Sequence, residues 1–247
     1  MVLSVLYLGR VAYREGLEIQ ARLVTLRKSG AIGDVLVMLE HPPVLTLGRN
    51  AGRENLVLTE DALAARGVEV VETNRGGDVT YHGPGQLVGY PIFDLRGPVR
   101  GERKWLGPVD FVRQIEEALI RTMADYGVAA ERVAGRTGVW TQPNGAIKEK
   151  KIAAIGIHVS AGVTSHGFAL NVTTDLRDFS WIVPCGISDR GVTSLELESP
   201  TSNPVSDLAL QTAAERVARQ FGRVFDTQVL WLESLDDLAP VHIESEA

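Results

Sequence analysis

Cysteine is almost absent from this chain, because only Cys185 among its 247 residues is a cysteine. One cysteine cannot form an internal disulfide, so the fold does not depend on an oxidising compartment. Long apolar runs are absent too, and no stretch approaches the roughly 18 residues of a membrane-spanning helix. The first residues contain neither a basic leader nor a cleavage site and are expected to form a strand. These absences predict a cytoplasmic protein that does not act at a membrane.

An excess of positive charge is also lacking. The chain has 31 acidic side chains against 25 lysines and arginines, a formal net charge of −6. This balance argues against nucleic acid as a partner, since nucleic-acid binding requires a basic face. A local basic surface is still conceivable where Arg96, Arg100, Arg103 and Lys104 fall close together, although most such runs are only solvated.

The order of expected elements indicates the fold class. Hydrophobic residues make up 45% of the chain, enough for a core without disulfides or metals. Strands come in runs interrupted by a few helices, which predicts an α+β fold with a mixed, largely antiparallel sheet and packed helices. We expect one catalytic domain over residues 1–247, whose final residues are acidic and frayed. The expected strands are Val2–Leu8, Asp34–Leu39, Val44–Leu47, Val68–Glu72, Gln86–Leu95, Gly138–Thr141, Ile155–Val159 and Phe168–Val172, and the expected helices are Ala12–Lys28, Glu60–Ala65, Pro108–Tyr126 and Val205–Arg223. Gly127 ends the third helix, and Ala161-Gly162-Val163 joins the last two strands as a hairpin.

One segment combines turn residues with chemically active groups. Arg75–Gln86 holds four glycines and a proline in twelve residues, which suits neither a helix nor a regular strand. Most glycine-rich loops are plain connections between strands. This one also carries an arginine, an aspartate, a tyrosine and a histidine, so we interpret it as backbone that lies close against a ligand.

Cys185 is a candidate nucleophile. It lies between Pro184 and Gly186, in a turn rather than on a strand face, although a lone cysteine is usually inert core. A thiol needs a neighbouring base or cation to become a thiolate at neutral pH. His82 and His166 are possible partners. A lysine is the other possibility, taken from Lys148, Lys150 and Lys151, of which Lys151 directly precedes an apolar strand.

The histidines do not indicate a metal site. His41, His82, His158, His166 and His242 show no metal-ligand spacing with each other or with the cysteine, so we expect no structural zinc. The glycine-rich run lacks the lysine and hydroxyl residues that end a phosphate-binding loop.

Several motifs taken together resemble the lipoyl(octanoyl) transferase family. The main ones occur in the family's order, and the resemblance covers about residues 1–225. The segments that carry it are Glu40–Arg49, Arg75–Gln86, Lys151–Gly156, Ser165–Val172 and Pro184–Gly186. The resemblance implies the fold shared by biotin and lipoate protein ligases.

The resemblance also implies which residues act. The family's catalytic pair falls on Cys185 and Lys151. Its substrate-binding positions fall on Arg75, Gly76, Gly77, Asp78, Val79, Thr80, Tyr81, His82, Ala154, Ile155, Gly156, Gly167, Phe168 and Ala169.

The implied activity moves an octanoyl group from octanoyl-acyl carrier protein to a lysine of a lipoyl domain, through a thioester on the cysteine. The acceptors implied are the lipoyl domains of 2-oxoacid dehydrogenases and the glycine cleavage H protein. No ATP, metal or other cofactor is expected, because exchange of one thioester for another is nearly balanced and thioester to amide runs downhill.

Three alternatives remain open on the sequence. An ATP-dependent lipoate–protein ligase on the same fold would need no cysteine, which disfavours it here. An amidotransferase that moves octanoyl from one lipoyl domain to another would differ only in its donor. A non-catalytic binder of lipoyl domains would never carry an octanoyl group itself.

Overall fold

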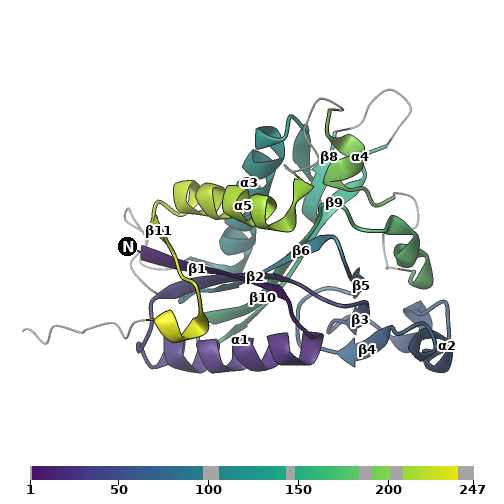
Figure 1. Ribbon diagram of the computed structural model, residues 1–247, viewed down its shortest axis with the longest axis horizontal. Helices are drawn as coiled ribbons and strands as arrows, with labels where there is room; N and C mark the ends of the chain where they lie inside the picture. The colour runs from purple at the N-terminus through teal and green to yellow at the C-terminus, as the bar shows by residue number, and fades with distance from the viewer. Residues whose placement is uncertain (1, 97–105, 143–147, 184–190, 201–207, 239–247) are drawn as a thin grey trace, which may run out of the picture.

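The computed structural model describes residues 2–96, 106–142, 148–183, 191–200 and 208–238 (Figure 1). The strands are β1 (Val2–Arg10), β2 (Asp34–Glu40), β3 (Val44–Leu47), β4 (Glu69–Glu72), β5 (Val79–His82), β6 (Gln86–Ile92), β7 (Ala130–Val133), β8 (Arg136–Thr141), β9 (Lys151–Ser160), β10 (Val163–Asn171) and β11 (Gln228–Trp231). The helices are α1 (Tyr13–Lys28), α2 (Glu60–Ala64), α3 (Pro108–Asp125), α4 (Leu195–Glu198) and α5 (Leu210–Val224), with 3₁₀ turns η1 (Arg53–Asn55), η2 (Leu176–Trp181) and η4 (Leu235–Asp237).

Two sheets organise the described residues. The larger has eight strands in the order β11-β1-β2-β6-β10-β9-β8-β7, and the smaller has the order β4-β3-β5. In the larger sheet, β1 pairs in parallel with β11 and β2, and the other neighbours are antiparallel. The predicted α+β class with a mixed, largely antiparallel sheet is therefore confirmed.

Helices cover both faces of the larger sheet. Helices α3 and α5 lie on one face and α1 on the other, while the smaller sheet and α2 lie to one side (Figure 1). Helix α3 begins at Pro108 and buries Phe111, Ile115 and Leu119 at intervals of four residues. The Phe221 ring of α5 lies 5.8 Å from the ring of Phe168 on β10. This contact fixes α5 behind the strands that form the site.

Strands β9 and β10 form the predicted hairpin. Ala161 and Gly162 make its two-residue turn, and both have positive φ, 49° and 83°. That geometry matches the right-handed twist of the strands. The resulting register sets Gly156 opposite Gly167 and Ala154 opposite Ala169. Two predicted binding segments are therefore paired side by side.

Residues 226–238 contain a strand and a 3₁₀ turn that the sequence did not predict. Strand β11 extends the larger sheet through parallel pairing with β1, and η4 follows it. Four residues between turns give a weak signal, and the partner strand lies at the other end of the chain. Helix α5 begins at Leu210, later than expected, while Val205 and residues 239–247 lie outside the described residues. Strand β7 and helix α4 were not predicted.

The glycine-rich run is not all loop. Its residues Val79–His82 form β5, which pairs antiparallel with β3. Val79 and Tyr81 are buried in the core of the smaller sheet. Alternation of apolar and polar side chains over these four residues is enough for a strand between the glycine-containing turns.

Candidate active site

A cavity of about 540 Å³ lies where the hairpin β9–β10 and strand β8 meet the glycine-rich run. This volume falls within the usual range of small-molecule sites. The predicted binding residues that line it are Arg75, Gly76, Gly77, Asp78, Val79, Thr80, His82, Ala154, Ile155, Gly156, Gly167, Phe168 and Ala169, together with the predicted catalytic Lys151.

Tyr81 is the predicted binding residue that does not line this cavity. Its hydroxyl donates to Asp178 Oδ2 at 2.6 Å, and its ring packs against Phe179 and Trp181. Alternation along β5 explains this, because neighbouring side chains of a strand point to opposite faces. Tyr81 therefore shares with Val79 the face toward the core of the smaller sheet, although Val79 also lines the cavity.

Close backbone contact holds the glycine-rich run on the hairpin. The Gly76 N–H donates to the Ile157 carbonyl at 2.9 Å. Gly77 has φ of 90°, a region that favours glycine. A Cβ on Gly156 would lie 2.4 Å from the Gly76 carbonyl oxygen. The two backbones can approach this closely only without a side chain at 156.

We therefore expect Gly156→Ala to destabilise the protein by about 1–3 kcal/mol, because a main-chain carbonyl must move. Urea unfolding measures the loss. Gly33→Ala is the matched control, since its Cβ would meet only the Val2 carbonyl at 3.9 Å. Equal stability of the two variants would contradict this account.

Arg75 ties the run to the smaller sheet. Its Nη2 donates to the Thr46 carbonyl at 2.6 Å and to Thr46 Oγ1 at 2.8 Å, and its Nε donates to the same hydroxyl at 3.1 Å. The guanidinium is buried, and desolvation lowers the pKa of Arg75. This cation therefore fixes backbone geometry at the wall of the cavity.

A chain of buried hydrogen bonds crosses the floor of the site. His82 Nδ1 donates to Gln86 Oε1 at 2.7 Å, and Gln86 Nε2 donates to Asn171 Oδ1 at 2.9 Å. Asn171 Nδ2 in turn donates to the Thr193 carbonyl at 2.9 Å. Burial lowers the pKa of His82 to about 3, so its imidazole is neutral. The chain links β5 to the segment beside Lys151.

Buried histidines make the stability depend on pH. Burial lowers the pKa of His41 to about 4, of His82 to about 3 and of His166 to about 4, all below the ordinary 6.5. Between pH 4 and 6.5 the unfolded chain then binds more protons than the folded one. Their contribution is complete above pH 6.5 and is lost as pH falls toward 4.

We expect the free energy of unfolding to fall by up to about 1.4 kcal/mol per pH unit for each of these histidines below pH 6.5. Urea unfolding between pH 7.5 and 4.5 measures this slope. His166→Gln should reduce the slope, because it removes one of the groups. An unchanged slope in that variant would show that His166 does not take part.

Lys151 is the lysine that enters the cavity; Lys148 and Lys150 do not line it. Burial, and then the charge of Arg136, lower the pKa of Lys151 to about 8. Its Nζ lies 4.7 Å from the centroid of the Trp140 ring. An amine with this pKa can both accept and release a proton near neutral pH.

The backbone of Lys151 is joined to the segment that follows the cysteine. The Lys151 N–H donates to the Gly191 carbonyl at 3.0 Å, and the Thr193 N–H donates to the Lys151 carbonyl at 2.9 Å. On the other side, the Val183 N–H donates to the Asn55 carbonyl at 2.9 Å. Cys185 itself lies outside the described residues, between these two anchored ends.

Several residues that line the cavity were not predicted from the sequence. Tyr13, Tyr90, Arg136, Trp140 and Asn171 belong to this group. Asn171 lies in the Ser165–Val172 motif, but no role was predicted for it. No sequence pattern pointed to Trp140 or Arg136 as site residues, because only the pairing of β8 with β9 brings them beside Lys151.

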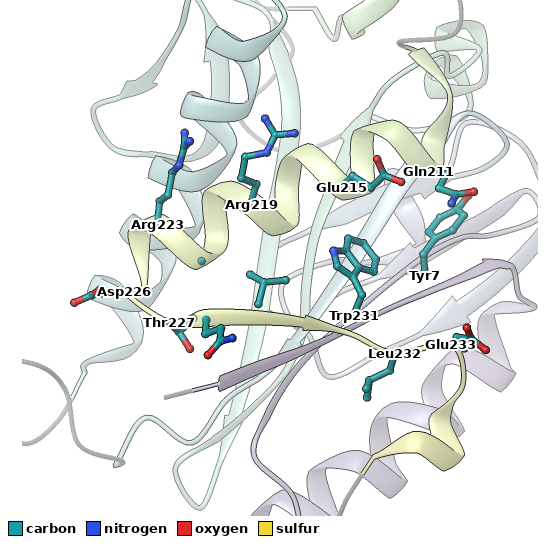
Figure 2. A pocket seen from close by; sticks show the side chains of 13 residues that line it. Tyr7, Gln211, Glu215, Arg219, Arg223, Asp226, Thr227, Trp231, Leu232 and Glu233 are labelled. Atoms are coloured by element: carbon teal, nitrogen blue, oxygen red, sulfur yellow. The ribbon is translucent and has the colours of Figure 1, made fainter.

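A second hollow, of about 1440 Å³, lies on other elements (Figure 2). It runs between α5 and β11, with Arg219, Arg223 and Glu215 on the helix and Trp231 near the strand's end (Figure 2). None of the predicted site residues lines it. Its mixed charges and open shape do not match the predicted chemistry.

The predicted basic surface is only partly described. The Arg96 guanidinium pairs with the Asp94 carboxylate at 2.9 Å. Arg100, Arg103 and Lys104 lie outside the described residues. Within the described ranges, no group of three or more histidine, acidic or cysteine side chains is arranged to hold a metal ion. Nor is any helix there long and apolar enough to cross a lipid bilayer.

Comparison with known proteins shows the family and the fold of this chain. The model of the lipoyl protein ligase A/B catalytic domain matches residues 12–222. A bipartite lipoate protein ligase from Thermoplasma acidophilum, solved in a study with its E2 lipoyl domain, superposes with a TM-score of 0.68 at 17% identity, covering 95% of this chain and 87% of that one. Lipoate-protein ligase A bound with ATP superposes with a TM-score of 0.67 at 16% identity, covering 95% and 89%. At these identities the likeness shows the fold.

Sequence relatives narrow the class further. An octanoyltransferase of Acidobacterium capsulatum is 65% identical over 241 residues, covering 97% of each chain. An octanoyltransferase of Koribacter versatilis is 54% identical, covering 97% of this chain and 90% of that one. The chain therefore belongs to the lipoyl protein ligase A/B catalytic domain family. Within it the chain groups with the octanoyltransferases, and it is a transferase enzyme of octanoyl transfer in lipoate biosynthesis.

Proposed function

We propose that this enzyme takes octanoyl from octanoyl-acyl carrier protein and transfers it to a lysine of a lipoyl domain, by way of a thioester on Cys185. We further propose that one domain carries the whole reaction. The observation that carries the proposal is the placement of Lys151. Its side chain lines the cavity, and its backbone holds the segment that begins six residues after Cys185.

The first half-reaction loads the enzyme. Lys151 Nζ accepts the proton of the Cys185 thiol, and the thiolate attacks the carbonyl carbon of the carrier thioester. A new C–S bond to Cys185 forms as the C–S bond to the carrier breaks. The departing carrier thiolate takes the proton from the Lys151 ammonium, so the enzyme is left acylated and the amine neutral.

The second half-reaction forms the amide. The neutral amine of the acceptor lysine attacks the carbonyl carbon of the Cys185 thioester. The C–N bond forms, the C–S bond breaks, and the amine proton passes through Lys151 Nζ to the cysteine sulfur. A shared base serves both steps because an amine with a pKa of about 8 both accepts and releases protons near neutral pH.

The octanoyl tail fits the apolar part of the cavity, where Ile155, Phe168 and Ala169 of the hairpin line the wall with Val88 and Phe179. Burial of about six methylenes is worth about 5 kcal/mol, which is enough to hold the chain. The acceptor lysine of the proposed reaction comes from a lipoyl domain. The archaeal ligase that shares this fold was solved in a study with its E2 lipoyl domain.

Intact-mass measurement tests the proposal directly. Incubation with octanoyl-acyl carrier protein, without ATP, should add the mass of one octanoyl group to the enzyme. Addition of an apo lipoyl domain should then return the enzyme to its original mass and acylate the domain. An enzyme that gains no mass, but acylates the domain from free octanoate and ATP, would be a ligase. Loading by an octanoylated lipoyl domain in preference to the carrier would make it an amidotransferase.

A further inference from the structure

Two cationic side chains lie over the buried indole ring of Trp140 at the edge of the cavity. Trp140 on β8 is fully buried, and the register of β8 against β9 places it opposite Lys151. Lys151 Nζ lies 4.7 Å from the centroid of the Trp140 ring, and Arg136 Cζ lies 5.8 Å from the same centroid. All three residues line the cavity.

The methylene chain of Lys151 reaches this ring by passing over Gly138, which has no side chain. A Cβ on Gly138 would lie 3.4 Å from Lys151 Cε and 3.7 Å from its Cδ. The Gly138 N–H is held by Glu116 Oε1 at 3.1 Å, which fixes that backbone from α3. Among the described residues, no carboxylate is ion-paired with Lys151, so the indole face is its charge-binding contact there.

We propose that Trp140 and Arg136 are positioning residues for Lys151, the indole face holding its Nζ at the cavity and the guanidinium keeping a second positive charge on the same ring. This inference rests on the proposed function, which makes Lys151 the shared proton acceptor and donor. The two neighbours act in opposite directions. The ring favours the ammonium form, whereas a nearby like charge disfavours it.

Other groups around the cavity do not replace Arg136 in this role. The charged and titratable side chains that share the cavity with Lys151 are Arg75, Asp78, His82, His166, Tyr13, Tyr90 and Arg136. Burial first and Arg136 second lower the pKa of Lys151, and the histidines are neutral near pH 7. Removal of the Arg136 charge should therefore make Lys151 hold its proton to higher pH.

The first test titrates Lys151 in the full-length enzyme. Competitive labelling of amines with acetic anhydride over a pH series, read by peptide mass spectrometry, gives the midpoint for Lys151. Arg136→Gln should raise this midpoint by about one unit, which at pH 7.5 lowers the neutral fraction about eightfold. Arg136→Lys should restore the original midpoint, and Arg66→Gln, at an exposed position in the turn after α2 that does not line the cavity, should leave it unchanged. An unmoved midpoint in Arg136→Gln would overturn the role of the guanidinium.

The second test separates the ring face from the rest of the indole. Trp140→Phe keeps an aromatic face, whereas Trp140→Leu removes it. We expect kcat to fall less than about fivefold in the first variant and more than about thirtyfold in the second, with KM for the octanoyl donor changed less than threefold. Equal losses of kcat in both variants would overturn the role of the ring.

A third experiment distinguishes failure of this inference from failure of the proposed function. The labelling is repeated in Cys185→Ala enzyme, where no acyl-enzyme can form. Persistence of the Arg136 effect supports the inference whether or not Cys185 is the nucleophile. Failure of wild-type enzyme to gain octanoyl mass, with the Arg136 effect intact, would refute the proposed function alone.

Discussion

Replacement of Cys185 by alanine is expected to lower kcat for octanoyl transfer by at least about 10⁴-fold, since a nucleophile that forms a covalent intermediate has no substitute. Steady-state assays with octanoyl-acyl carrier protein and an apo lipoyl domain measure the loss. Intact-mass spectra of the variant should show no octanoyl adduct. This is the largest effect that we expect from any single substitution.

Cys185→Ser refines the same experiment. A hydroxyl is a far weaker nucleophile than a thiolate, so turnover should fall nearly as much, but any adduct that forms would be an ester and would resist hydroxylamine better than a thioester. Urea unfolding of both variants serves as the control for folding. Turnover within tenfold of wild type in Cys185→Ala would exclude the cysteine as nucleophile.

Lys151→Met is expected to give the second largest loss, about 10²–10⁴-fold in kcat, the usual contribution of general acid–base catalysis. The methionine fills the space of the lysine stem beside Trp140 without supplying an amine. In wild type, the rate should rise as pH increases through about 8, because the neutral amine is the form that accepts a proton and burial lowers the pKa of Lys151 to about 8. The variant should lack this limb of its pH–rate profile.

Lys150→Met is the matched control, because Lys150 directly precedes Lys151 at the start of β9. Its side chain does not line the cavity, so its activity should stay within about threefold of wild type. Three lysines precede the apolar strand, and this pair of variants decides which of them acts. A larger loss from Lys150→Met than from Lys151→Met would move the base by one position.

Local pattern was enough to predict most of the elements. Alternating apolar residues and the Ala161-Gly162 turn predicted the β9–β10 hairpin, and Pro108 and Gly127 bounded α3. These signals act over a few residues, so a single sequence carries them. The motifs also pointed to residues that line the cavity.

The features that the sequence did not predict depend on strand pairing between distant parts of the chain. Strand β11 was missed because its stability comes from β1 at the opposite end of the chain. Trp140 was missed for the same reason, since the β8–β9 register alone places it beside Lys151. Tyr81 shows the converse error, in which a continuous motif suggested contact but the alternation of β5 turned one side chain into the core.

The two hydrogen bonds that connect Lys151 to Gly191 and Thr193 involve only main-chain atoms. Exchange of the side chain at 151 therefore removes no donor or acceptor from these two bonds, and we expect the methionine variant to keep the anchorage of the neighbouring segment. The side chain at this position can consequently change in evolution without rebuilding the strand that supports it. A ligase and a transferase could share this architecture and differ chiefly in the few side chains mounted on it.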